Sequence, residues 1–182
     1  DIPLVRAMNA MFFEPFSEDR QPVLDPPDGA ARRISAPGLV PPRAPAPFLP
    51  IYKWDGTLNA LHALAATDPD PYDDAILEYR NPISGGPALK TIGLAIQLLR
   101  PGARTHAHRH TSGTLYHAVR GQGFTVINGA SFAWTAGDFL VVPPWAWHEH
   151  ENGSATMEAI LFQMNDIPAM KALGLYREQA QR

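Results

Sequence analysis

The sequence contains no cysteine, which excludes disulfide bonds and thiolate metal sites and leaves nitrogen and oxygen ligands for any metal. Charge is also scarce: charged residues make up 18% of the 182 residues, and the net charge of −3 provides no electrostatic footprint for nucleic acid or an anionic membrane. No apolar run approaches the roughly 18 residues of a membrane span. The start also lacks the basic-then-apolar layout of a signal peptide. We therefore expect a cytoplasmic protein with neither nucleic-acid nor membrane partners.

Proline, in contrast, is abundant in the first half, and we interpret residues 1–87 as a proline-rich extended arm or linker. Most of the nineteen prolines fall there, which excludes a long helix or a central strand. Aromatic residues alternate with these prolines and favour packing on a partner surface, so we expect a homo-oligomer or a partner half. Apolar residues at helical spacing predict a short helix near 56–66, with His62 on its surface. The opening Asp1, followed directly by apolar residues, suggests a fragment or processed chain.

From residue 88 to residue 165 the pattern changes to short β-rich runs separated by turn residues. Regular short strands of this kind predict an all-β sandwich or barrel with short flanking helices. Asn128-Gly129, between two alternating runs, is a strong hairpin signal, because a type I′ turn needs positive φ at both central residues. Apolar residues at helical spacing predict that 166–182 form a C-terminal helix.

The histidines are the candidate metal ligands. His106, His108 and His110 recur at every second residue, so on a strand all three would project from one face. Forty residues later, His148 and His150 repeat this spacing. A single histidine is as often a surface group, but five at these spacings favour a site. Three neutral imidazoles facing one point suit Fe(II), Zn(II), Ni(II) or Cu(II).

These spacings resemble the two motifs of the cupin family. The first motif runs from Gly102 through His108 and His110 to Gly121, with Thr114 where many cupins have a glutamate ligand. The second runs from Gly137 through Pro143 and His148 to Asn152, with Trp145 in place of a usual glycine. The resemblance implies a cupin double-stranded β-helix, a jelly-roll barrel. It also implies a metal held by His108, His110 and His148, with open positions for substrate and O₂ and with His106 outside the site.

Longer strings are similar to gentisate 1,2-dioxygenase and its relatives that act on salicylate and 1-hydroxy-2-naphthoate. These strings are Glu78-Tyr79-Arg80-Asn81-Pro82, Ser84-Gly85-Gly86-Pro87 and the run from Val142 to His150. The likeness spans nearly the whole chain and corresponds to the second half of those two-cupin enzymes with the connecting segment. It implies an Fe(II)-dependent, extradiol-type ring-cleaving dioxygenase that acts on gentisate or a related hydroxylated aromatic carboxylate with O₂.

The resemblance also suggests residues for the substrate. His150 would hydrogen-bond substrate or oxygen as a catalytic residue. Tyr116 stands where the catalytic cupin of this family has an arginine for the substrate carboxylate, so carboxylate recognition must come from elsewhere, or this half is weakly active. Trp134, Trp145 and Trp147 would more often be core or interface, and we assign only Trp147 to an aromatic pocket.

Two alternatives to a dioxygenase stay open. In the first alternative, the barrel would be a non-catalytic metal-binding cupin that supports a partner half. Tyr116, in place of the arginine, favours this alternative. In the second, the same three histidines would serve a different metal enzyme, such as an isomerase or another small-molecule dioxygenase using zinc, nickel or manganese, because a fold does not determine its chemistry.

Overall fold

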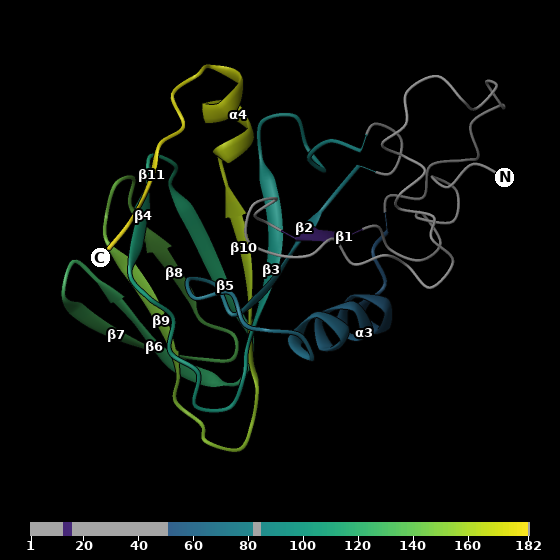
Figure 1. Ribbon diagram of the computed structural model, residues 1–182, viewed down its shortest axis with the longest axis vertical. Coiled ribbons are helices and arrows are strands. Elements are labelled where there is room, and N and C mark those ends of the chain that lie inside the picture. The colour runs from purple at the N-terminus through teal and green to yellow at the C-terminus, as the bar shows by residue number, and fades with distance from the viewer. Residues whose placement is uncertain (1–12, 16–50, 82–84, 182) are drawn as a thin grey trace, which may run out of the picture.

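The structure is a computed structural model that describes residues 13–15, 51–81 and 85–181. Two antiparallel sheets face each other and enclose the interior of a barrel (Figure 1). The larger sheet has the strand order β1-β2-β3-β10-β5-β8, and the smaller has the order β11-β4-β9-β6-β7. The strands are β1 (Phe13–Pro15), β2 (Ala75–Tyr79), β3 (Gly93–Leu99), β4 (His108–His110), β5 (Thr114–Arg120), β6 (Gln122–Ile127), β7 (Ala130–Thr135), β8 (Phe139–Val142), β9 (His148–Asn152), β10 (Ala159–Asn165) and β11 (Glu178–Ala180).

The hairpin of β6 and β7 confirms the strongest local prediction. Its strands pair from Gln122↔Thr135 to Ile127↔Ala130, and the turn between them is Asn128-Gly129. Both turn residues have positive φ, 49° at Asn128 and 84° at Gly129. Positive φ at both central positions is what a type I′ turn requires and what this residue pair tolerates best.

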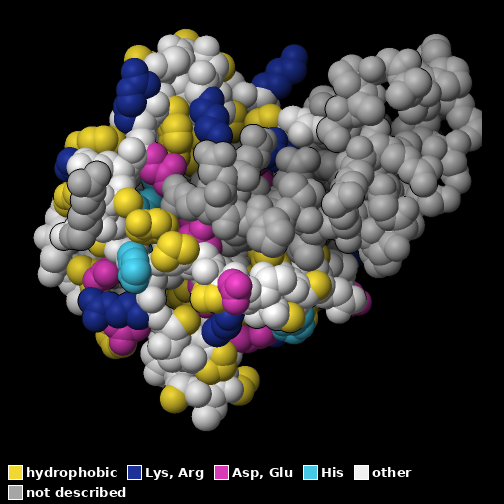
Figure 2. Space-filling model, viewed as in Figure 1, with side chains coloured by type: hydrophobic (Ala, Val, Ile, Leu, Met, Phe, Trp, Pro, Cys, Tyr) yellow, Lys and Arg dark blue, Asp and Glu magenta, His cyan; other side chains and the backbone are white. Residues whose placement is uncertain are grey.

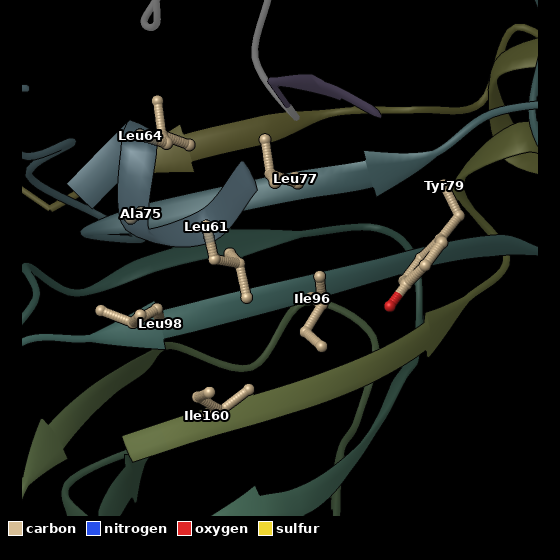
Figure 3. Close-up of a cluster of buried hydrophobic side chains, with 8 residues drawn as sticks. All are labelled: Leu61, Leu64, Ala75, Leu77, Tyr79, Ile96, Leu98 and Ile160. Atoms are coloured by element: carbon tan, nitrogen blue, oxygen red, sulfur yellow. The ribbon is translucent and has the colours of Figure 1, made fainter. Parts of the chain in front are cut away.

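A hydrophobic cluster joins helix α3 (Trp54–Ala65) to the outer face of the larger sheet. Leu61 and Leu64 of the helix are buried against side chains from β2, β3 and β10, as Figure 3 shows. The sheet contributes Leu77, Ile96 and Ile160 among others. The helix lies close to the predicted range and supports the sheet from outside, so the other face of that sheet is left to line the barrel interior.

The barrel interior is part apolar and part polar. A second buried cluster includes Leu99, Tyr116, Trp134 and Leu161. Along β10, residues 159, 161, 163 and 165 are buried from Ala159 to Asn165, which is the period-two pattern of one strand face. The polar members of this face bring hydrogen-bonding groups into the interior, which a purely structural core has little reason to contain.

The larger sheet begins earlier in the chain than the pattern of short strands indicates. Strand β2 pairs with β3 and lies before the barrel boundary predicted at residue 88. The proline-rich stretch of residues 16–50 falls outside the described residues.

The predicted C-terminal helix is wrong for most of its length. Helix α4 covers only Ile167–Ala172, and Gly174 follows with a φ of 69°. A residue in this left-handed conformation commonly ends a helix. The chain then forms β11, which pairs with β4 (Figure 1).

Neither described helix is long and apolar enough to cross a membrane. Figure 2 shows basic and acidic side chains interspersed with hydrophobic ones over the described part of the face in view. This mixed surface agrees with the small net charge of −3.

Candidate metal centre

Strands β4 and β9 bring the candidate ligands together. His108 and His110 are inward residues of β4, and His148 is the first residue of β9, paired directly with His108. Alternation along each strand turns the three side chains to the same side, into the barrel. All three are buried, and one nitrogen from each lies within 4.8 Å of the others. These are the three histidines that the resemblance to the cupin motifs implies.

The imidazole rings pack closely, with His110 and His148 edge to face and the other two pairs tilted. Ring centroids are 4.3 Å apart for His108 and His148, 5.0 Å for His110 and His148, and 5.7 Å for His108 and His110. Two of the rings are oriented by carbonyl groups of their own segments. Nδ1 of His110 lies 2.9 Å from the carbonyl oxygen of Ser112, and Nδ1 of His148 lies 3.0 Å from that of Ala146.

The carbonyl contact of His148 decides which of its ring nitrogens can bind a metal. A carbonyl oxygen only accepts, so Nδ1 of His148 carries the proton and Nε2 presents its lone pair. Nδ1 of His110 also lies 2.8 Å from the Ser112 hydroxyl, which can donate or accept. Nε2 of His148 is buried and has no hydrogen-bond partner among the described residues. A buried acceptor without a donor is costly unless a ligand occupies it, so the donor set fits a divalent metal.

Burial favours the neutral form of His110 and His148. It lowers the pKa of His110, and together with the neighbouring His108 and His110 it lowers the pKa of His148 well below its ordinary value. Neutral imidazole is the form that coordinates metals, so protons compete weakly for this site near pH 7. Three neutral nitrogens leave a bound divalent ion with its positive charge uncompensated, which favours an anionic chelating ligand.

His106 does not belong to the group. It is exposed and precedes β4, and its ring packs against Tyr72 at a centroid distance of 5.9 Å. Tyr72 also meets the ligand candidate His108 edge to face, at 5.8 Å. Sequence reasoning missed Tyr72, since a tyrosine in a loop of prolines and aspartates carries no signal of such a contact.

His150 and Tyr116 meet inside the barrel, beside the three histidines. Their ring centroids are 4.7 Å apart, and the His150 ring lies 6.0 Å from that of His148. Burial, followed by the His148 ring, lowers the pKa of His150 to about 3. Burial, followed by the Asp73 carboxylate, raises the pKa of Tyr116 above its ordinary value. Both side chains are therefore neutral at physiological pH.

Trp147 makes its described ring contact away from the three histidines. The guanidinium of Arg109 lies 4.4 Å from the Trp147 ring. It also lies 4.4 Å from the Trp145 ring. Arg109 alternates with the two inward histidines of β4 and so projects to the opposite face of that strand. The structure therefore does not bring Trp147 together with His150 and Tyr116.

Trp145 adopts a backbone conformation that suits glycine better. Its φ is 62°, a left-handed value that is rare for a bulky residue. This explains why a glycine is usual at the position. The Trp145 N–H donates to the carbonyl oxygen of His110 at 2.7 Å, so the turn before β9 is tied to the end of β4.

Comparison with known proteins agrees with this geometry. A family model described as a cupin domain matches residues 95–163. The chain contains a cupin domain. The expected jelly-roll fold is confirmed, and the histidine group lies on two strands of this cupin.

The cupin chain is also similar to curated ring-cleaving enzymes. It is 42% identical to a 5-aminosalicylate 1,2-dioxygenase from Comamonas sp, over 99% of this chain and 48% of the relative. It is 35% identical to a gentisate 1,2-dioxygenase from Aquipseudomonas alcaligenes, over 98% of this chain and 52% of the relative. The chain thus spans about half the length of the curated relatives it matches.

A solved structure gives the same relation. Salicylate 1,2-dioxygenase from Pseudoaminobacter salicylatoxidans with gentisate adducts is 27% identical, with a TM-score of 0.66, and the match covers 71% of this chain and 36% of that one. The predicted resemblance to the gentisate dioxygenase family is therefore confirmed.

Proposed function

We propose that this cupin is a non-haem iron dioxygenase domain that cleaves gentisate or a related hydroxylated aromatic carboxylate. The observation that carries the proposal is the group of three buried imidazoles formed by His108, His110 and His148. The named dioxygenase activities of its relatives support the reaction class. When bound, Fe(II) would supply a Lewis-acidic centre for a bidentate aromatic anion and a site for O₂.

The residues of this chain would then have separate roles. The three histidines would hold the metal through nitrogen, and the Nδ1 contacts of His110 and His148 would keep their rings oriented. His150 would donate a hydrogen bond to the bound substrate, and the neutral Tyr116 phenol would border the aromatic ring. Water would be kept out by the apolar cluster below, which includes Leu99 and Leu161. We leave Trp147 out of this assignment because of its contact with Arg109.

One observation favours a second candidate, a metal-binding cupin without turnover that supports a partner half. Among the described residues, none of the buried ones is a lysine or an arginine, the side chains that would neutralise a substrate carboxylate inside the barrel. The Asp73 carboxylate near Tyr116 would also repel an anion.

The two candidates differ in oxygen consumption. Protein loaded anaerobically with Fe(II) is dialysed, analysed for iron and mixed with gentisate or 5-aminosalicylate in an oxygen electrode. If the domain is a dioxygenase, we expect about one iron per chain and O₂ uptake with either acid. His148→Ala should lose both iron and uptake, whereas His106→Ala, which removes an exposed imidazole of the same segment, should keep both.

The other outcomes distinguish the two candidate functions. Iron without uptake for either acid would support the non-catalytic cupin. A chain that holds stoichiometric Zn(II) or Ni(II) but not Fe(II) would contradict the iron assignment. Failure to retain any metal would contradict the proposed three-histidine metal site.

A further inference from the structure

His148 and His150 are two inward imidazoles on one strand, yet their Nδ1 atoms have opposite kinds of partner. Nδ1 of His148 faces a carbonyl oxygen, which can only accept a hydrogen bond. Nδ1 of His150 lies 2.9 Å from Oγ1 of Thr125, a hydroxyl that can donate or accept. Which of the two it does decides the tautomer of His150.

Trp134 resolves this choice. Its indole Nε1–H, which can only donate, lies 3.0 Å from the same Thr125 oxygen. Thr125 is fully buried, and its side chain bonds to these two partners and no other described group. If His150 also donated to it, the hydroxyl proton would be buried without an acceptor, at a cost of about 1–3 kcal/mol. Thr125 therefore accepts from Trp134 and donates to Nδ1 of His150.

This chain of donors leaves the proton of His150 on Nε2. That atom is buried and has no hydrogen-bond partner among the described residues. The ring lies between Tyr116 and His148, at centroid distances of 4.7 Å and 6.0 Å. An N–H without an acceptor thus stands in the barrel interior, next to a nitrogen lone pair on His148 that lacks a donor.

We infer that Thr125 and Trp134 are positioning residues that fix His150 as an Nε2–H donor to an anionic oxygen of the substrate. The inference rests on the proposed function for the identity of that substrate, but the tautomer itself rests on the three hydrogen-bonding side chains alone. It also explains why His150 is not a fourth ligand, since its Nε2 carries a proton where that of His148 carries a lone pair. Neither Thr125 nor Trp134 has to touch the substrate to act in this way.

The tautomer can be observed without activity. The Zn(II)-loaded protein, labelled with ¹⁵N-histidine, is examined by long-range ¹H–¹⁵N correlation NMR. We expect an Nε2–H tautomer for His150 and an Nδ1–H tautomer for His148 in the wild type. Thr125→Val should shift His150 away from the Nε2–H form and Thr125→Ser should restore it. Thr105→Val, which removes a hydroxyl bonded only to the backbone N–H of His150, should leave it unchanged. An Nδ1–H tautomer for His150 in the wild type would overturn the inference.

A second readout connects the tautomer to binding. Fe(II)-loaded protein is titrated anaerobically with gentisate and followed by its visible absorption. Thr125→Val should bind about tenfold more weakly with unchanged iron content, and Thr125→Ser should bind like the wild type. Unchanged affinity in Thr125→Val despite a shifted tautomer would overturn the positioning role. If the tautomers are as expected but the wild type binds no gentisate, the result would contradict the proposed function and would still support the hydrogen bonds from Trp134 to Thr125 and from Thr125 to His150.

Discussion

At the scale of single residues, strand β6 leaves no space for a side chain at Gly123. A Cβ there would lie 2.1 Å from the carbonyl oxygen of Glu151 and 2.6 Å from the Trp134 ring, whereas one at Gly153 would meet nothing closer than 3.5 Å. We expect Gly123→Ala to lower the free energy of unfolding by about 3 kcal/mol, through displacement of Trp134 and its strand. Gly153→Ala should change it by less than about 0.5 kcal/mol. Urea denaturation of both variants tests this, and equal losses would contradict it.

Single residues of the site differ in how far the sequence predicts them. Local spacing indicates inward histidines, because period two on a strand places side chains on one face. The resemblance to the cupin motifs then implies His108, His110 and His148 rather than His106. Thr125 could not be assigned in this way. Its partner His150 lies across the pairing of β6 with β9, in a register that only the folded sheet defines. We expect Trp134 in the core or at an interface, and it lies in the core, but its Nε1–H has a polar partner that composition does not reveal.

Among the elements, helix α3 offers a pair of adjacent residues for comparison. Leu61 is fully buried against the larger sheet, and His62 is exposed and paired with Glu158 at 2.9 Å. Leu61→Ala should lower the free energy of unfolding by about 2–5 kcal/mol, through lost burial and the cavity left behind. His62→Ala should cost at most about 1 kcal/mol, since an exposed polar contact between side chains contributes little. Thermal denaturation measures both, and a larger effect for His62→Ala would reverse the assignment of the buried face.

Strand β11 covers the strand that holds two of the candidate ligands. It pairs with β4 from Glu178↔His110 to Ala180↔His108, whereas β4 pairs with β9 only at His108↔His148. Removal of residues 177–182 should therefore loosen β4 and weaken Zn(II) affinity by about tenfold, roughly the effect of one or two lost hydrogen bonds. Gln179→Ala removes the side-chain bond to Arg109 but keeps the strand, and should bind Zn(II) normally. Competition with a chromogenic chelator gives both affinities, and an unchanged truncated protein would show that β4 needs no support.

The elements also show why some predictions held and others did not. The turn at Asn128-Gly129 is encoded by two residues with unusual backbone freedom, so it could be predicted locally. The segment after Gly174 could not, because its three strand residues gain their hydrogen bonds from β4, more than sixty residues earlier in the chain. Helical spacing of a few apolar residues does not reveal that competing partner.

For the whole molecule, the buried imidazoles link stability to pH. Burial lowers the pKa values of His110, His148 and His150 below the ordinary 6.5, which we take for the unfolded chain. Above that pH both states are neutral and the full stability is present. As pH falls, the unfolded chain takes up protons that the folded protein does not, so the free energy of unfolding decreases. The loss should be about 1 kcal/mol per pH unit for each histidine, and for His150 it extends to about pH 3.

Urea denaturation of the metal-free protein at a series of pH values between about 7 and 4 measures this dependence. His150→Gln removes one titrating group and should make the decline less steep by about 1 kcal/mol per pH unit, whatever the carboxylates contribute, because they are common to both proteins. His106→Gln changes an exposed imidazole of the same segment and should leave the slope as in the wild type. If stability falls with pH as steeply in His150→Gln as in the wild type, His150 takes up its proton in the folded protein as readily as in the unfolded chain. That result would contradict the expected effect of its full burial on its pKa.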